Sequence, residues 1–308
     1  MKLLALFVSL LILAVPLSAQ KRYYRGNTHT HCYPRSSDVK DSTYTAQKII
    51  ASYKSKGYDF LVFTDHLNYW NADSLSSPDL TVIGGSEAGL SAGYRGHFTA
   101  MNIKTNISGR GKTFQQLVDD IVADRGIPFL NHPRWSVIPV SAVQILNEMR
   151  TGLNHLEVYN SNTDSPTKYD TSVWDSVLTS GRIMYGVASD DSHREAYQGK
   201  AWICVYASSL EKDTLLQAIR TGDFYASNGI ILETVYYSNE GVRVKSKNGT
   251  RIRFIGRRGA ILDSLQRGEG FYRIRGDEGY VRVEIANDQN ETAWTQPMMV
   301  GSFDIQKP

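Results

Sequence analysis

Histidine and carboxylate side chains recur along this chain in short clusters that could together bind metal ions. Six of the seven histidines stand in five clusters, most of them at the end of an apolar run. The potential ligands in and near these clusters are His29, His31, His66, Glu87, His97, His132, Asp191 and His193. Imidazole and carboxylate groups are the usual ligands of zinc, manganese and iron. So many of them would suit two or three cations sharing a bridging oxygen, which indicates metal-assisted hydrolysis.

The spacing of His29 and His31 suits a single cation. Alternate side chains of an extended segment lie on one face, so both imidazoles can approach the same ion. A carboxylate such as Glu87 or Asp191 could bridge cations and offset their charge, while the pKa of a bound water falls towards neutrality. The resulting hydroxide is the expected nucleophile, because Ser192, although it precedes His193, has no nucleophile-elbow motif around it.

Short apolar runs alternate with helical patterns between residues 25 and 207. The runs at 60–63, 81–83, 98–101, 127–130, 155–159, 184–188 and 201–206 are expected to be strands buried on both faces. Helical patterns occupy 45–55, 113–124 and 210–220. This alternation favours a parallel α/β sheet closed into a barrel. Most histidine clusters follow a predicted strand, and the strand ends are where α/β barrels carry their catalytic residues.

The pattern changes after Gly229, where short alternating strands with Gly, Asn and Asp turns predict a small antiparallel β-sandwich. Residues 241–282 contain eleven Lys or Arg against four Asp or Glu. Such a basic face could attract anionic glycans, lipids or nucleic acid. Arginine alternating with apolar residues is, however, typical of the solvated face of an antiparallel strand. No nucleic-acid partner is therefore expected.

The first nineteen residues have the features of a secretory signal. Lys2 precedes an apolar run over residues 3–17 and a small-residue end at Ser18-Ala19, so we expect cleavage after Ala19. The run is short for a membrane span, although a retained anchor is the alternative interpretation. We therefore expect an exported protein, periplasmic or secreted, with no stable membrane insertion after signal cleavage.

Two cysteines and one histidine are expected to be structural. Cys32 and Cys204 are too few for a disulfide framework, so the fold must depend on packing. Cys32 follows His31, but a cysteine buried in the core is favoured over a metal ligand. His155 stands apart from the other histidines.

The order of the motifs resembles the PHP superfamily, named after polymerase and histidinol phosphatase. Over residues 25–207 the chain shows, in the family's order, His29-Thr30-His31, Thr64-Asp65-His66, Glu87, His97, Asn131-His132-Pro133 and Asp191-Ser192-His193. The resemblance implies a distorted seven-stranded β/α barrel. Residues 222–229, 280–284 and 293–297 are similar to carbaryl-hydrolase-like members that append a β-sandwich. We accordingly expect a signal peptide at 1–19, a metal-dependent hydrolase domain at 20–228 and a sandwich at 229–308.

The resemblance also implies ligands for two or three divalent ions, which could be zinc, manganese or iron. One metal would be held by His29, His31, Glu87 and Asp191. A second would be held by Glu87, His97 and His132, and a third by Asp38, His66 and His193. The family often has Ser-Asp-Gly soon after its first motif, whereas this chain has a longer segment at 32–39. An ordinary turn aspartate is therefore an equal interpretation of Asp38.

Asp65, Arg134 and Arg194 adjoin ligand motifs and are the candidate catalytic residues. Either arginine could clamp a phosphate with two hydrogen bonds and stabilise charge that develops in the transition state. The alternative is a structural ion pair with one of the nearby carboxylates Asp65, Glu157 and Asp190. Aromatic side chains near the expected rim could stack a substrate ring or simply pack their loops. These are Tyr69, Trp70 and Trp135.

The expected function is that of an exported metal-dependent hydrolase acting on a small-molecule ester or phosphoester. A phosphomonoester is the first expectation, attacked by metal-bound hydroxide. Alternatively, the same site could hydrolyse a phosphodiester or a carboxylic or carbamate ester. A different class is a non-catalytic, metal-stabilised protein that binds envelope or glycan material. The size of the ligand set argues against that class, because a structural zinc site is usually closed by four ligands.

Overall fold

A computed structural model describes residues 20–66, 68–90, 95–135, 139–164 and 166–301. The predicted signal peptide, residues 1–19, lies outside these residues. Within the described ranges, no helix is long and apolar enough to cross a membrane. The α-helices described in the α/β part are α1 (Ala46–Ser55), α2 (Phe114–Ala123), α3 (Ala142–Glu148), α4 (Thr171–Thr179) and α5 (Lys212–Thr221). Its strands are β1 (Arg22–Asn27), β2 (Phe60–Phe63), β3 (Thr81–Leu90), β4 (Arg95–Met101), β5 (Ile127–Asn131), β6 (His155–Asn160), β7 (Tyr185–Ser189), β8 (Trp202–Ala207) and β9 (Phe224–Ser227).

These strands form a mixed sheet in the order β9-β8-β1-β2-β3-β4-β5-β6-β7. The expectation of a parallel sheet is wrong at β3–β4, β4–β5 and β1–β8, which pair antiparallel. Only residues 91–94 separate β3 from β4, whereas a parallel pair needs a crossover of about a dozen residues or more. Because β4 reverses, β5 resumes the direction of β3 and also pairs antiparallel with β4. Every predicted strand of residues 60–206 is present.

The segments that follow β1 and β7 meet, although these strands stand far apart in the sheet order. Thr30 and Ser192 form an isolated parallel bridge, and the amide of His31 donates to the carbonyl of Ser192 at 3.0 Å. The Asn27 side chain donates to the carbonyl of His29 and accepts from the amide of Asp190. These contacts bring two histidine-bearing segments together. Among the described residues, β7 does not pair with β1, so closure of the sheet into a seven-stranded barrel stays a prediction.

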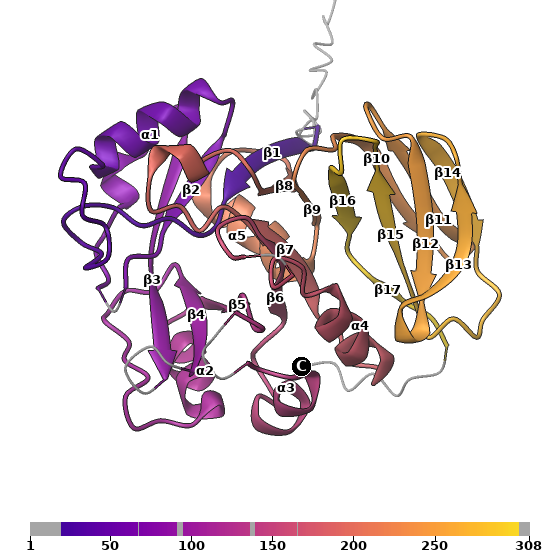
Figure 1. The fold of residues 1–308 in the computed structure, drawn as a ribbon, viewed down its shortest axis with the longest axis horizontal. Helices are drawn as coiled ribbons and strands as arrows, with labels where there is room; N and C mark the ends of the chain where they lie inside the picture. Colours follow the sequence, from indigo (N-terminus) through magenta and orange to yellow (C-terminus); the bar gives the residue numbers. More distant parts are fainter. Residues whose placement is uncertain (1–19, 67, 91–94, 136–138, 165, 302–308) are drawn as a thin grey trace, which may run out of the picture.

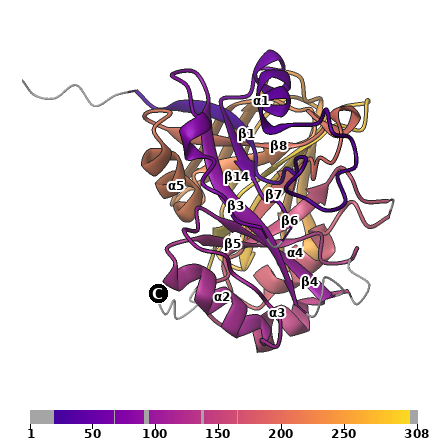
Figure 2. The same cartoon turned by 90° about the vertical axis from the view of Figure 1, so that its left-hand side faces the viewer.

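The helices cover the outside of the strands, as Figures 1 and 2 show. The predicted helices at 45–55 and 113–124 are confirmed as α1 and α2, and each begins at a threonine whose hydroxyl accepts a backbone amide of the first turn. The predicted helix at 210–220 is confirmed as α5, which ends at Gly222 with φ of +77°. Glycine adopts this left-handed conformation without steric cost, so it suits a helix end.

The C-terminal strands form two antiparallel layers beside the α/β part (Figure 1). They are β10 (Leu232–Ser238), β11 (Gly241–Ser246), β12 (Arg251–Gly256), β13 (Ala260–Leu265), β14 (Glu269–Arg273), β15 (Tyr280–Ala286), β16 (Thr292–Thr295) and β17 (Met298–Met299). One layer is the sheet β10-β11-β14, and β12, β13, β15 and β16 continue the main sheet through pairing of β16 with β9. Apolar residues of both layers share one buried cluster with residues of α1 and β2. The domain boundary at 228/229 stays a prediction.

Basic residues of β11 lie on a solvated strand face, as the alternation in sequence indicated, whereas Arg282 of β15 is buried. In β11, Arg243 and Lys245 are exposed whereas Val242 and Val244 are buried. Lys245 lies 2.9 Å from a carboxylate oxygen of Glu233, and Arg243 lies 3.8 Å from one of Glu269. The charge of this face is therefore partly neutralised within the protein.

Candidate metal centre

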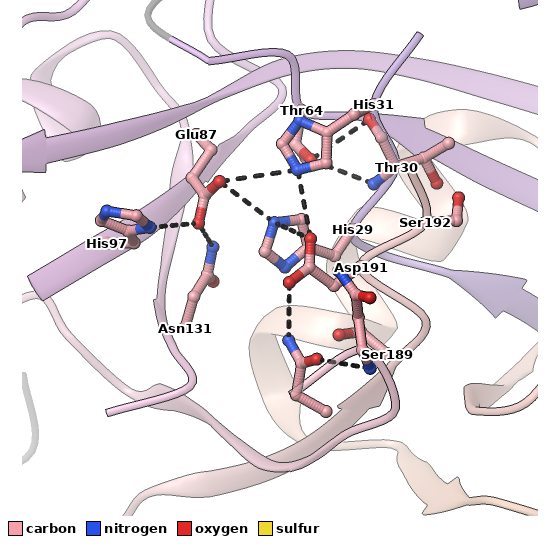
Figure 3. A network of polar contacts seen from close by, with 12 residues as sticks. His29, Thr30, His31, Thr64, Glu87, His97, Asn131, Ser189, Asp191 and Ser192 are labelled. Atoms are coloured by element: carbon pink, nitrogen blue, oxygen red, sulfur yellow. Dashed lines mark hydrogen bonds and ion pairs between the residues drawn. The ribbon is translucent and has the colours of Figure 1, made fainter. Parts of the chain in front are cut away.

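All nine predicted metal ligands come together in the structure, and six of them lie in segments that follow a strand. His29 and His31 follow β1, His66 follows β2, His132 follows β5, and Asp191 and His193 follow β7. Glu87 and His97 lie within the paired strands β3 and β4, and Asp38 comes from the loop before α1. Four overlapping groups of these side chains place their ligand atoms within 4.8 Å of one another. Figure 3 shows Glu87 and Asp191 directed towards His29 and His31.

The spacing of ligand atoms at the first position matches that of a metal site. Nε2 of His29 lies 3.3 Å from both Glu87 Oε2 and Asp191 Oδ1. Nε2 of His31 lies 3.5 Å and 3.3 Å from the same oxygens. Two ligand atoms bound at about 2.1 Å to a tetrahedral zinc ion would stand about 3.4 Å apart. Each of the two imidazoles therefore faces both carboxylates at the separation that a shared cation requires.

Glu87 extends the site towards a second position. Its Oε1 lies 3.0 Å from Nδ1 of His97 and 3.2 Å from Nε2 of His132, and it also accepts a hydrogen bond from Nδ2 of Asn131 at 2.9 Å. Its other oxygen faces the first position. Glu87 is thus placed to bridge two cations, as the resemblance implied.

A third group lies at the outer edge of the site. Asp38 Oδ2 is 2.9 Å from Nε2 of His66 and 2.9 Å from Nε2 of His193. His31 belongs to the same group and stacks on His193 with ring centroids 4.1 Å apart. The placement of Asp38 between two imidazoles favours its interpretation as a ligand over that of a turn aspartate.

The polar atoms at the centre of the site fit a bound cation. Among the described residues, the buried atoms His29 Nε2, His31 Nε2 and Asp191 Oδ1 have no partner with hydrogen-bond geometry. The opposite nitrogen of each ring is anchored, since His29 Nδ1 contacts Glu157 Oε1 at 2.9 Å and His31 Nδ1 contacts Ser36 Oγ at 2.8 Å. Metal-ligating histidines characteristically use their second nitrogen in this way. The residues present therefore fit divalent ions.

The electrostatic environment of the site also favours a bound cation. Burial opposes ionisation of His29, yet Asp191, Glu87 and Glu157 together raise its pKa well above the ordinary value. Burial raises the pKa of Glu87 and of Asp191, but the surrounding histidines outweigh it and hold both values well below the usual range. Burial and the neighbouring His193 lower the pKa of His31 to about 3, which keeps this ring in the neutral form that binds metals.

In fold, the chain is similar to a solved structure described as containing a predicted PHP-like metal-dependent phosphoesterase. That solved structure is a two-domain protein from Bacteroides vulgatus containing a predicted phosphoesterase of this kind, with 16% identity over 92% of this chain and 96% of that chain and a TM-score of 0.43. PsfC from Pseudomonas syringae is 14% identical over 64% of this chain and 87% of its own, with a TM-score of 0.48. PfuEndoQ, a lesion-specific endonuclease from Pyrococcus furiosus, is 14% identical over 66% of this chain and 56% of its own, with a TM-score of 0.46. No protein-family model and no curated protein sequence matches the chain.

A cavity of about 280 Å³ opens over the candidate ligands. Beside the ligand side chains, its lining contains Trp135, Asn162 and Thr163. Trp135 is 47% exposed, and its indole meets the rings of His97 and His132 edge to face. Asn162 Nδ2 lies 3.3 Å from Nδ1 of His193. Nothing in the sequence pattern singled out Asn162 and Thr163, which lie in the loop after β6.

The candidate catalytic residues outside the ligand set have other contacts. Arg134 donates from Nε to Asp170 at 2.8 Å and from Nη2 to the carbonyl of Pro166 at 2.9 Å, so its contacts do not support a phosphate clamp. Its partner Asp170 was not among the carboxylates that the sequence suggested. Arg194 is exposed and stacks on Tyr197 with its guanidinium carbon 4.2 Å from the ring centroid. Its clamp role stays a prediction.

Asp65 is buried and contacts the backbone next to the candidate ligand His31. It accepts from the amide of Cys32 at 2.7 Å and from Nε1 of Trp70 at 2.8 Å, which fixes the segment that follows His31. Cys32 and Cys204 are confirmed as buried free thiols. His155 is buried outside the site, where Nε2 donates to the carbonyl of Ile219 at 3.0 Å.

Proposed function

We propose that this protein is a metal-dependent phosphoesterase of the PHP type that hydrolyses a small phosphomonoester. The observation that carries the proposal is the convergence of nine histidine and carboxylate side chains, seven of which line one cavity. Among the described residues, three buried ligand atoms at its centre also lack hydrogen-bond partners. A structural zinc site needs only four ligands and no cavity. An open set of this size suits catalysis better than structural support.

Divalent cations bound here would supply positive charge that polarises a phosphoryl group and favours deprotonation of water. The protein's own side chains would hold and orient these cations. Glu87 and Asp191 present oxygens to more than one imidazole and would offset the charge of neighbouring ions. Ser36 orients His31, and Asn131 orients Glu87. Because these supporting groups are buried, little reorganisation is needed as charge develops on the substrate.

The cavity supports a small substrate. Its volume of about 280 Å³ lies just below the range for small-molecule sites, roughly 300–1,000 Å³. The organic part of the substrate would lie against Trp135, Asn162 and Thr163, which offer one apolar face and two short polar groups. We further propose that zinc, manganese or iron occupies the site in two or three positions, because these metals accept mixed imidazole and carboxylate ligands.

The test is product release by the purified protein on matched phosphomonoester, phosphodiester and carboxylic ester substrates, with zinc, manganese or iron supplied in turn. Asp191→Ala serves as the inactive control. Glu278→Gln serves as the matched control, because Glu278 is a buried carboxylate remote from the site. We expect phosphate release from the monoester that Asp191→Ala abolishes and Glu278→Gln retains. Preference for another substrate would replace the monoester assignment, and no hydrolysis by metal-loaded protein would contradict the proposal.

We also propose that the protein is exported and that the α/β part is a distorted seven-stranded barrel. The export proposal is supported by the charged start, apolar run and small-residue end of residues 1–19. N-terminal sequencing of protein recovered outside the cytoplasm should begin at Gln20. Recovery of unprocessed chain inside the cell alone would contradict export.

A further inference from the structure

Glu157 on β6 holds three other segments of the metal centre together. Its carboxylate is 2% exposed. Oε1 contacts His29 Nδ1 at 2.9 Å and also accepts from the hydroxyl of Ser189, while Oε2 accepts from the amide of His132 at 2.8 Å. Nδ2 of Asn160, three residues along the same strand, donates to Oε2 at 2.9 Å. Side chains or backbone at the ends of β1, β5 and β7 thus meet on one buried carboxylate.

Two of the candidate ligands adopt backbone conformations that ordinary residues avoid. His132 has φ of +23° and Asp191 has φ of +49°, and neither residue is glycine. Such conformations are unfavourable for residues other than glycine and persist where the surroundings fix them. Glu157 binds the backbone amide of His132, and Nδ2 of Asn160 lies 3.3 Å from Oδ2 of Asp191. The pair formed by Glu157 and Asn160 therefore contacts both strained ligands.

The direction of the hydrogen bonds requires a carboxylate at position 157. The backbone amide of His132 and the side-chain Nδ2 of Asn160 can only donate to Oε2, and the Ser189 hydroxyl contacts Oε1. If His29 binds a cation through Nε2, its remaining proton sits on Nδ1 and also points at Oε1. An acceptor-only group satisfies all of these donors, whereas a glutamine would place an NH2 group against at least one of them.

We propose that Glu157 and Asn160 are positioning residues that set the metal affinity of the centre. Glu157 fixes the ring orientation and tautomer of His29 and the backbone of His132, and Asn160 fixes Glu157 and Asp191. Neither residue contacts substrate in this account. The proposal rests on the proposed function, because it requires that divalent ions bind the candidate ligands.

The test measures Mn²⁺ binding by calorimetry to metal-free protein, together with the bound metal content per chain. Glu157→Gln keeps the shape of the side chain but introduces a donor, and Asn160→Ala removes the contact with Asp191. Glu278→Gln is the control, since Glu278 is likewise buried and accepts from the amides of Arg275 and Gly276 and from the Tyr272 hydroxyl. Unfolding of the metal-free proteins is followed in parallel to separate metal affinity from stability.

Loss of a group that orients a metal ligand typically weakens metal affinity about 10–100-fold. We expect a loss of this size in Glu157→Gln, a smaller loss in Asn160→Ala, and wild-type affinity in Glu278→Gln. The metal-free Glu157→Gln protein should melt close to the metal-free wild type. Equal affinity of wild type and both variants would overturn the inference while leaving the proposed function intact. If Glu157→Gln does not fold, wild-type affinity in Asn160→Ala would overturn it. A wild-type protein that binds no Mn²⁺, zinc or iron would instead overturn the proposed function.

Discussion

Arg282 of β15 forms a two-point ion pair with Asp175 of α4, which joins the C-terminal strands to the α/β part. Its Nε lies 2.7 Å from Asp175 Oδ1 and its Nη2 lies 2.8 Å from Oδ2. Tyr280 also donates to Asp175 Oδ1 at 2.7 Å, and Glu284 accepts from Arg282 Nη1 at 2.8 Å. The arginine is 2% exposed, so the pair lies in the interior.

Removal of one partner should therefore be strongly destabilising. Asp175→Ala leaves the Arg282 guanidinium buried with Glu284 as its remaining carboxylate, and breaking such a pair costs about 3–5 kcal/mol of unfolding free energy. Urea unfolding measures this change. Glu233→Ala, which removes the exposed pair with Lys245, is the control and should cost about 1 kcal/mol or less. Equal losses in the two variants would contradict a structural role for the buried pair.

His155 gives the fold a defined pH dependence. It is buried between the rings of Phe129 and Phe224, and burial lowers its pKa to about 4 from an ordinary value of 6.5. As the pH falls through 6.5, His155 of the unfolded chain takes up a proton, whereas His155 of the folded protein stays neutral until about pH 4. The free energy of unfolding therefore falls by about 1.4 kcal/mol per pH unit across this window.

The substitution His155→Gln should remove this contribution, because an amide can still donate to the carbonyl of Ile219 but does not titrate. Comparison of urea unfolding at pH 7 and pH 5 gives the change for each protein. We expect wild type to lose about 2 kcal/mol more than the variant between the two values. An identical loss in both proteins would show that His155 is not responsible.

Several features of the fold were predictable because they depend on local patterns. Threonines 45 and 113 begin helices where the apolar periodicity starts, and Gly222 ends one. The histidine motifs follow apolar runs, and parallel strands bring their carboxyl ends to one edge. The candidate ligand set therefore followed from motif order and strand position together.

Other features depend on contacts between segments far apart in the chain. The reversal of β4 depends on the connection after Leu90, and periodicity alone does not report strand direction. Glu157 stands within the run Leu156 to Asn160 without a motif that identifies His29 as its partner. Asp170, the partner of Arg134, is likewise separated from it in sequence by helix α3 and strand β6. Such pairings become visible only when the strands are placed in the sheet.

The two arginines beside the ligand motifs should have different effects when replaced. Arg134→Ala leaves the buried carboxylate of Asp170 without its cation, so we expect a loss of about 1–3 kcal/mol in unfolding free energy and little change in turnover by the folded protein.

Arg194→Ala should leave stability within about 0.5 kcal/mol and lower turnover about tenfold to hundredfold with metal retained. Normal hydrolysis by Arg194→Ala would remove the clamp role.

If the proposed activity is correct, Trp135 should determine how well the protein binds an aromatic leaving group. Its exposed indole lines the cavity, and contact between aromatic rings contributes about 0.5–1.5 kcal/mol. Trp135→Ala should raise KM about twofold to tenfold for an aryl phosphate and leave KM for a small alkyl phosphate unchanged. Tyr236→Ala, an exposed aromatic on β10, is the control. An equal change for both substrates would contradict stacking on Trp135.

The central claim is that hydrolysis depends on cations bound by the nine converging side chains. Metal-free protein, prepared with a chelator, is titrated with Mn²⁺ while bound metal and phosphate release are measured on the same samples. We predict that activity is absent without metal, rises with bound metal and saturates at two or three ions per chain, and that Asp191→Ala neither fills the site nor gains activity. Hydrolysis that survives full metal removal, or complete metal binding without any hydrolysis of the ester substrates, would contradict this account.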